Sequence, residues 1–238
     1  MTIADRVARI RDEMAQAALS VGRDPKEIKL CAATKMNDAD AVRQAIAAGV
    51  DCCGENRVQE LVAKQGENAY AGAPVHFIGR LQTNKVRQVV GKVALIQSVD
   101  RMNLLEALQK EAARQGITQD ILLECNIAAQ DSKAGFSPAE IWDLLPKMGQ
   151  YENLQVRGLM AIPPISRFPG ENFHFFKEML QLSVDIRAKK YDNIEVDFLS
   201  MGMSDDFRDA ICAGSNLIRL GTAIFGPRNY TMPYQPGC

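Results

Sequence analysis

One lysine lies where covalent chemistry is expected. Lys35 follows the short apolar run 29–34 and precedes a turn and a helix that starts near Asp38. Removing a lysine charge from water is costly, so an amine at the end of a buried strand loses its proton more readily and becomes a nucleophile. Such an amine forms a Schiff base with a carbonyl compound. The alternative for this segment alone is a lysine whose apolar stem lets its charge reach solvent.

An arginine inside an apolar run predicts an anion site. Arg219 lies in the run Leu217–Leu220, where an unpaired charge is very costly, so it needs a buried carboxylate or a ligand atom as its partner. Gly221 and Thr222 follow directly and offer backbone N–H groups and a hydroxyl. The loop of residues 199–207 offers a second set of ligand groups, namely Ser200, Gly202 and Ser204. Ser204 is also predicted to cap a helix, and such a helix N-terminus suits a phosphate.

A further polar cluster, Gly54–Glu60, follows another apolar run. Asn56 is predicted to face a ligand and Glu55 to pair with Arg57, although helix capping alone also explains such a cluster. Together these segments offer an amine nucleophile, a phosphate cradle and a buried arginine. A phosphorylated aldehyde satisfies all three, which predicts pyridoxal 5′-phosphate (PLP) bound to Lys35 as a Schiff base.

Composition sets the broad class of the protein. The chain has 238 residues, 47% of them hydrophobic and 24% charged, which is typical of one large α/β domain or two small ones. A formal net charge of -1 gives no electrostatic case for nucleic acid or an anionic membrane. No apolar stretch has the length of a membrane-spanning helix. Residues 1–10 form an amphipathic pattern rather than a signal peptide, which predicts a cytoplasmic protein.

The cysteines and histidines predict no metal site. The two histidines, His76 and His174, are far apart, and no C-x-x-C spacing is present. Without an export signal, the cysteines are expected to be free and mostly buried thiols. They are Cys31, Cys52, Cys53, Cys125, Cys212 and Cys238.

Short apolar runs alternate with amphipathic helices along the chain, which predicts a parallel sheet. The predicted strands are Leu30–Ala33, Asp51–Cys53, Val75–Ile78, Ala94–Gln97, Ile121–Ile127, Gln155–Leu159, Glu195–Leu199 and Leu217–Leu220. A capping box at Ser137–Glu140 predicts a helix that runs to Met148. The regular spacing favours a single closed (β/α)8 TIM barrel over residues 1–238, with an extra helix at 2–20, rather than an open doubly wound sheet. In such barrels function concentrates at the C-terminal ends of strands, where Lys35 lies.

Several motifs of the chain match a known family. The chain resembles the PLP homeostasis proteins, called YggS in bacteria and PROSC in animals, over nearly its whole length. The matching segments are Lys35, Gly54–Glu60, His76–Gly79 with Leu81-Gln82 and Asn84-Lys85, Asp131–Gly135, Gly158–Pro164, Leu199–Phe207 and Arg219–Gly226. The resemblance implies a fold-type III PLP-binding barrel similar to the N-terminal domain of alanine racemase. It also implies PLP on Lys35, phosphate contacts from residues 200–204 and 221–222, and Arg219 facing the pyridine nitrogen.

An arginine in that position favours a carrier over an enzyme. A permanent cation disfavours protonation of the ring, and an unprotonated ring is a weaker electron sink. Racemisation also needs an acid or base on the face opposite the lysine. Alanine racemase, which the chain resembles, takes this group from a second domain. We expect no room for such a domain after the eighth strand. Tyr230 and Tyr234, in the proline-rich tail, are poor candidates for a positioned acid.

The sequence therefore predicts a non-catalytic, PLP-binding protein of intracellular vitamin B6 homeostasis. Such a protein stores, buffers or delivers the cofactor and acts indirectly on amino-acid and keto-acid balance. PLP-dependent apoenzymes are its candidate partners, and a monomer is expected. One alternative is a fold-type III PLP enzyme such as an amino-acid racemase. The other is an aldolase that forms its Schiff base on Lys35 without a cofactor.

Overall fold

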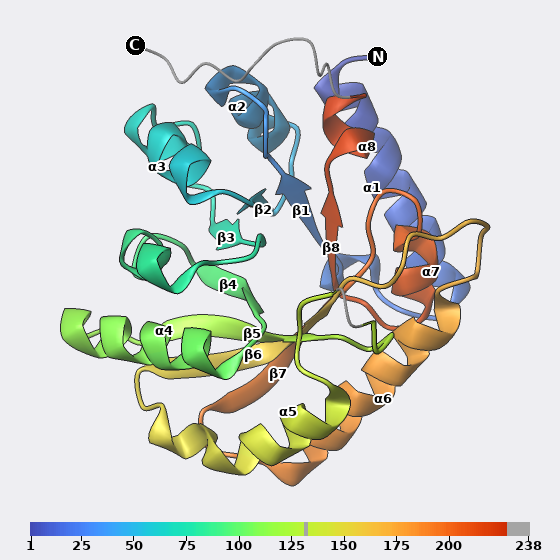
Figure 1. The fold of residues 1–238 in the computed structure, drawn as a ribbon. Coiled ribbons are helices and arrows are strands. Elements are labelled where there is room, and N and C mark those ends of the chain that lie inside the picture. The colour runs from blue at the N-terminus through green and yellow to red at the C-terminus, as the bar shows by residue number, and fades with distance from the viewer. Residues whose placement is uncertain (131–132, 228–238) are drawn as a thin grey trace.

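The protein forms a closed barrel of eight parallel strands in sequence order (Figure 1). The computed structural model describes residues 1–130 and 133–227; Asp131, Ser132, Tyr230, Tyr234 and Cys238 lie outside them. The strands are β1 Lys29–Ala33, β2 Cys52–Glu55, β3 Val75–Phe77, β4 Leu95–Val99, β5 Gln119–Cys125, β6 Leu154–Ala161, β7 Ile194–Ser200 and β8 Leu217–Leu220. The predicted (β/α)8 barrel is confirmed, and each predicted strand is present with bounds that agree to within two residues.

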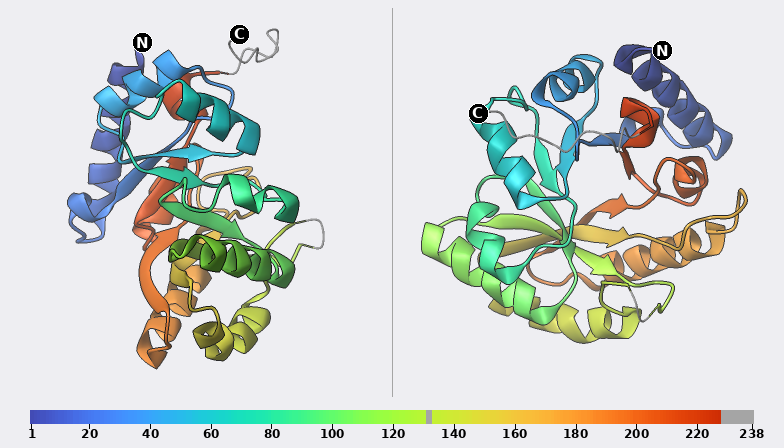
Figure 2. Two further views of the ribbon diagram at one scale, coloured as in Figure 1. Left: turned by 90° about the vertical axis from the view of Figure 1, so that its left-hand side faces the viewer. Right: turned by 45° about the horizontal axis from the view of Figure 1, so that its top comes forward.

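Helices surround the strands, as both views of Figure 2 show. The α-helices are α1 Ile3–Ser20, α2 Ala39–Ala47, α3 Val58–Gly66, α4 Met102–Gln115, α5 Pro138–Leu144, α6 Phe173–Lys189, α7 Phe207–Cys212 and α8 Thr222–Phe225. The short 3-10 helices are η1 Pro25–Glu27, η2 Thr83–Gln88 and η3 Leu145–Gln150. The predicted extra helix is α1, which packs beside α7 and α8. Within residues 1–130 and 133–227, no helix is both long and apolar enough to span a membrane.

Local sequence signals explain where several helices begin and end. The predicted capping box is confirmed, because the Ser137 hydroxyl accepts from the Glu140 N–H while the Glu140 carboxylate accepts from the Ser137 N–H. The prediction that this helix continues to Met148 is wrong. The α-helix ends at Leu144 and η3 follows, because Pro146 has no N–H for the helical ladder and its ring disfavours the preceding turn.

The inside of the barrel changes from apolar to polar along the strands. A buried apolar cluster fills one level and consists of Cys31, Cys52, Leu95, Leu122, Met160 and Leu217. Side chains alternate between the two faces of a strand, so residues two positions further on also point inward. These residues are polar on several strands, namely Gln97, Glu124, Ser200 and Arg219, and all are buried. The polar level lies toward the C-terminal strand ends, where Lys35 follows β1.

One pair of neighbouring strands is joined less fully than the others. β7 and β8 share a single register pair, Ser200 with Leu217. Side chains from the turn before β8 supply further bonds, because the Ser215 hydroxyl lies 2.8 Å from the Met201 carbonyl oxygen and 3.0 Å from that of Leu199. The Asn216 side chain accepts from the Leu199 N–H at 2.8 Å. Side-chain hydrogen bonds therefore supplement the backbone bond from the Asn216 N–H to the Leu199 carbonyl oxygen in closing the barrel here.

Candidate functional site

Lys35 lies in the turn directly after β1 and is half-buried. β1 pairs with β2 on one side and with β8 on the other, so the turn borders the strand that precedes Asn56 and the strand that carries Arg219. The next residue, Met36, has a φ of 60°, a left-handed conformation that is uncommon for a residue other than glycine. Such backbone persists only where the surroundings hold it in place.

A buried ionic cluster holds the backbone on both sides of Lys35. The Lys64 ammonium donates to the Thr34 carbonyl oxygen at 2.7 Å and also to the Glu55 carboxylate at 2.7 Å. The Glu60 carboxylate accepts from the Met36 N–H at 2.7 Å. The side chains of Lys64, Glu55 and Glu60 are all at least 97% buried. We call Glu55, Glu60 and Lys64 the lysine clamp, because they hold the residues before and after Lys35.

Two hydroxyl groups add further hydrogen bonds to the clamp. The Glu55 carboxylate accepts from the Thr34 hydroxyl at 2.5 Å and from the Tyr70 hydroxyl at 3.1 Å. Burial, followed by the nearby Glu55 charge, raises the pKa of Tyr70, so this phenol stays a donor. All these donors reach Oε1 of Glu55, whereas Oε2 of Glu55 and Oε1 of Glu60 are buried without a hydrogen-bond partner.

The predicted pairing of Glu55 with Arg57 is wrong. Glu55 pairs with Lys64, and the exposed Arg57 lies 3.8 Å from Glu60. The sequence signal for this cluster was the spacing of Val58, Leu61 and Lys64, which places the lysine on the buried face of α3.

Arg219 begins a chain of hydrogen bonds that crosses the barrel interior. Its guanidinium donates to the Ser200 hydroxyl at 2.5 Å and to the Ala161 carbonyl oxygen at 3.0 Å, and both of these partners are uncharged. The Ser200 hydroxyl donates to the Gln97 side-chain oxygen at 2.6 Å. The Gln97 amide nitrogen lies 2.8 Å from Nδ1 of His76, so the network assigns the proton of the neutral imidazole to Nε2.

Ser200, which was predicted in the phosphate loop, belongs instead to this chain of hydrogen bonds. Ser200 is the last residue of β7 and is fully buried, with its hydroxyl shared between Arg219 and Gln97. Its place in the structure is therefore beneath the loops, where it orients the arginine. Burial lowers the pKa of Arg219, and the nearby Glu124 acts against that shift.

We call the end of the barrel at the C-terminal ends of its strands the mouth. Two loops at the mouth meet through their hydroxyl groups. The Thr222 hydroxyl lies 3.2 Å from that of Ser204, which joins the loop after β8 to the loop after β7. Gly202 has a φ of 95°, and a Cβ atom there would lie 2.7 Å from the Ala210 side chain, so only glycine fits. The carbonyl oxygen of Gly202 also accepts from the Arg219 N–H at 3.1 Å.

The predicted helix cap at Ser204 is wrong. α7 begins at Phe207 with Asp206 as its N-cap residue, and the Asp206 carboxylate instead accepts from the Met203 N–H at 2.7 Å. The Ser204 hydroxyl is consequently used between the two loops and not on the helix. Gly221 lies against the end of β1, where a Cβ atom would be 3.6 Å from Ala33.

Asn56 carries an unused acceptor at the mouth. Its Oδ1 atom is buried and has no hydrogen-bond partner, an arrangement that is rare in proteins. The main chain of Asn56 is held by close packing, because a Cβ atom at Gly79 would lie only 2.1 Å from the Asn56 carbonyl oxygen. A buried acceptor of this kind fits a hydrogen-bonding ligand.

A cavity of about 960 Å³ lies beside the mouth, between α3 and the segment after β3. Asn56 is part of its wall, together with four cationic side chains, those of Arg57, Arg80, Lys85 and Arg101. Arg80 is 73% exposed and lies 3.5 Å from Asp100. The cavity is thus positively charged at its rim, in contrast to the chain as a whole.

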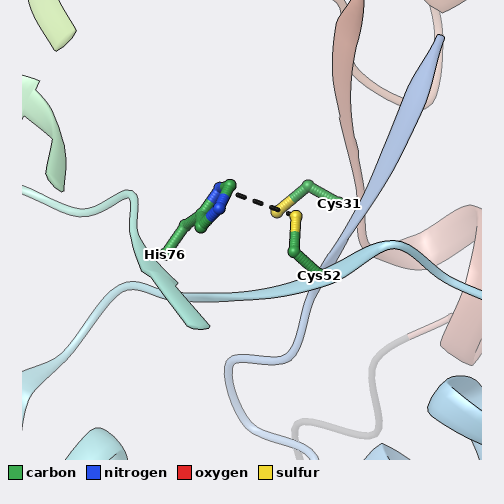
Figure 3. Close-up of side chains that lie close together, drawn as sticks. All are labelled: Cys31, Cys52 and His76. Atoms are coloured by element: carbon green, nitrogen blue, oxygen red, sulfur yellow. Dashed lines mark hydrogen bonds between the residues drawn. The ribbon is translucent and has the colours of Figure 1, made fainter. Parts of the chain in front are cut away.

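Three further side chains of the interior lie close together. Potential metal-ligand atoms of Cys31, Cys52 and His76 all lie within 4.8 Å of one another (Figure 3). Burial lowers the pKa of His76 to about 4, and the hydrogen bond to Cys31, followed by burial, raises the pKa of Cys52. Sequence spacing predicted no such group, because the three residues come from three strands and meet only through the sheet register.

Glu124 is expected to make stability depend on pH near neutrality. It is buried on β5, and burial, followed by the Asp100 charge, raises its pKa to about 7 from an ordinary value of 4.5. The folded protein therefore holds this proton more tightly than the unfolded chain, and the stability that this provides below pH 4.5 is lost as the pH rises through 7. Between pH 4.5 and 7, we expect the free energy of unfolding of wild type to fall by up to about 3 kcal/mol relative to that of Glu124→Gln.

Urea unfolding of both proteins at a series of pH values measures this difference. The exposed Glu106→Gln is the matched control, and its free energy of unfolding should run parallel to that of wild type. A constant difference between wild type and Glu124→Gln from pH 4.5 to 7 would contradict the raised pKa.

Known proteins of similar sequence and fold place the barrel in a family. Residues 8–229 match the family described as alanine racemase, N-terminal domain. The chain belongs to this family.

Within the family, the chain belongs with the pyridoxal phosphate homeostasis proteins. It is 37% identical to the protein of that name from Aquifex aeolicus, over 97% of this chain and 100% of the relative. It is 38% identical to the Escherichia coli protein of the same name, over 96% of this chain and 98% of the relative. The solved structure of PipY from Synechococcus elongatus with PLP bound is 33% identical and has a TM-score of 0.81, covering 94% of this chain and all of PipY.

Proposed function

We propose that this protein binds PLP covalently through Lys35 and acts as a non-catalytic carrier in vitamin B6 homeostasis. The observation that supports this most strongly is the lysine clamp, which fixes the backbone on both sides of one amine at the C-terminal end of a barrel strand. Relatives of the same length are named for pyridoxal phosphate homeostasis, and one is described with PLP bound. The five cysteines within residues 1–130 and 133–227 are free thiols, which suits the reducing cytoplasm.

The residues at the mouth fit a phosphorylated pyridine aldehyde. The amine of Lys35 is the group that would form the bond, and the loops at Gly202–Ser204 and Gly221–Thr222 offer N–H groups and hydroxyls for a phosphate. The unpartnered Asn56 Oδ1 is an acceptor for a donor on the ligand. When bound, PLP supplies an electron sink for chemistry at the α-carbon of amino acids.

Arg219 supports a carrier over an enzyme. Both hydrogen-bond partners of its guanidinium are uncharged, so its positive charge is available to a ligand inside the barrel. A guanidinium at the pyridine nitrogen keeps this nitrogen unprotonated, which weakens the electron sink. The protein would then hold the cofactor without turning over amino acids, and PLP-dependent apoenzymes would be the recipients.

Absorption spectroscopy followed by borohydride reduction tests the proposal. We expect purified protein incubated with PLP to absorb in the visible region and, after reduction, to carry one pyridoxyl group on the peptide that contains Lys35. Incubation of the loaded protein with L-alanine in deuterium oxide tests turnover, and we expect no exchange of the α-proton above that with free PLP. Exchange that depends on Lys35 would instead assign a racemase-like enzyme, and absence of PLP uptake would exclude both PLP functions.

Arg219→Ala is expected to weaken PLP binding and to shift its visible absorption. The substitution removes the cation that would face the ring, and it also frees the hydroxyl of Ser200. We expect a loss of about 10-fold or more in affinity, in line with about 1.5–3 kcal/mol for a hydrogen bond to a charged group. Spectrophotometric titration with PLP measures both effects. Arg157→Ala is the matched control, because Arg157 of β6 pairs with Glu195 near the start of β7, and equal effects of the two substitutions would contradict the proposed role.

A further inference from the structure

We propose that Cys31, Cys52 and His76 form a zinc site inside the barrel, below the mouth. The three side chains come from β1, β2 and β3 and converge in Figure 3. Cys31 and Cys52 are register partners on neighbouring strands, and His76 lies on the next strand. This inference is independent of the proposed PLP function.

The ligand set suits zinc. Thiolate sulfur and imidazole nitrogen are its usual protein ligands, and two cysteines with one histidine make a known three-ligand zinc site with an open fourth position. The candidate atoms already lie within 4.8 Å of one another and need to approach only slightly to reach tetrahedral contact with one ion. Gly54, the inward-facing neighbour of Cys52, leaves space for the sulfur of Cys31, because a Cβ atom there would lie 2.9 Å from it.

Charge balance favours a divalent ion in this place. Cys31 is fully buried, Cys52 is 3% exposed and His76 is 8% exposed, so a net charge here is costly. The metal-free site holds two neutral thiols and a neutral imidazole. Binding of Zn²⁺ releases two protons to solvent and forms two sulfur–zinc bonds and one nitrogen–zinc bond, which leaves the net charge of the site at zero.

Zinc binding also affects the hydrogen-bond chain that leads to Arg219. The Nδ1 atom of His76 lies 3.5 Å from the Cys52 sulfur and accepts from Gln97 at 2.8 Å. An ion coordinated by this nitrogen replaces the Gln97 bond, because the neutral ring has one lone pair there. Gln97 in turn contacts Ser200, the partner of Arg219, so an occupied zinc site would be connected to the mouth through two side chains.

Cobalt substitution tests the site directly. The experiment uses full-length protein without PLP, because PLP absorbs in the visible region. A Cys212→Ser/Cys238→Ser background removes the half-buried thiol and one that lies outside the described residues. We expect one Co²⁺ per chain, with sulfur-to-cobalt charge-transfer bands and intense visible bands of a tetrahedral ion, and displacement of Co²⁺ by one equivalent of Zn²⁺.

Single substitutions identify the ligands. Cys31→Ser and Cys52→Ser should each weaken Zn²⁺ binding by more than about 100-fold, since even residues that only orient a ligand contribute about 10–100-fold. Cys53→Ser is the matched control and should leave binding unchanged, because Cys53 is also buried but follows Cys52 on β2 and therefore faces the opposite side of the sheet. Thermal unfolding checks that each variant folds. Absence of stoichiometric Co²⁺ and Zn²⁺ binding by the parent, or binding that survives in Cys52→Ser, would overturn the proposal.

Discussion

Replacement of Lys64 by methionine is expected to lower the free energy of unfolding by about 3–5 kcal/mol, the typical cost of removing one partner of a buried ion pair. Lys64 is 1% exposed, and its ammonium forms a salt bridge with the Glu55 carboxylate at 2.7 Å. Methionine has a similar volume, so the loss arises from the buried carboxylate left without its cation and from the Thr34 carbonyl oxygen left without its donor. Urea unfolding measures the change.

The matched control for this prediction is Arg57→Met. Arg57 is exposed and lies 3.8 Å from Glu60, so its removal deletes a cation next to the clamp without stranding Glu55. An exposed ion pair of this kind contributes at most about 1 kcal/mol. The double variant Glu55→Gln/Lys64→Met should recover part of the loss, because it removes the stranded charge. Equal losses in Lys64→Met and Arg57→Met would show that the clamp is not an energetic unit.

Under conditions in which Lys64→Met remains folded, this substitution should also weaken the uptake of PLP. The turn around Lys35 loses the bond that holds Thr34, whereas Glu60 still holds Met36. An amine displaced from its position reacts less readily, because binding and covalent capture depend on pre-organised geometry.

Lys35→Ala is expected to abolish the visible absorption of protein-bound PLP and all borohydride-stable labelling of the barrel. The amine that would form the bond is absent, and no neighbouring group of the clamp replaces it, because Lys64 is fully occupied by Thr34 and Glu55. The free energy of unfolding should change by no more than about 1 kcal/mol, since Lys35 is only half-buried and lies in a turn. Absorption spectra, peptide mapping and urea unfolding measure these effects.

Lys133→Ala is the matched control for Lys35→Ala. Lys133 is the second lysine near the strand ends, where its ammonium donates to the Ile162 and Pro163 carbonyl oxygens at 3.0 and 2.7 Å. Burial lowers its pKa, which makes it the rival nucleophile. We expect labelling of Lys133→Ala to equal that of wild type. A pyridoxyl group mapped to Lys133 in wild type would contradict the assignment to Lys35.

The positions of the functional strand ends could be predicted because they depend on local patterns. Apolar runs and helix starts recur along the chain at a regular spacing, so the turn that carries Lys35 and the strand that carries Arg219 were placed correctly. The partners of these residues depend on how distant elements pack. Glu55 meets Lys64 only because α3 folds back over the end of β1, and nothing in the spacing of the two residues requires it.

The register of the strands explains two further differences between the sequence predictions and the structure. Ser200 was predicted in a phosphate loop, but β7 extends to this residue and the alternation of side chains points it into the barrel. Cys31, Cys52 and His76 have no metal-binding spacing in the sequence, and they converge only because three parallel strands align in one register. A one-residue change of register would turn these side chains to the outside of the sheet.

The sparse pairing between β7 and β8 bears on how the barrel would open. A closed ring of strands opens first where its hydrogen bonds are fewest, through a local fluctuation that needs less free energy than global unfolding. Ser215 and Asn216 supplement the few backbone bonds of that edge with their side chains, so we expect its amide protons to exchange with solvent ahead of those in the rest of the ring. The loops at Gly202–Ser204 and Gly221–Thr222 follow these two strands, and such an opening separates them. The lifetime of a molecule held between the loops would then follow this local breathing rather than the stability of the whole fold.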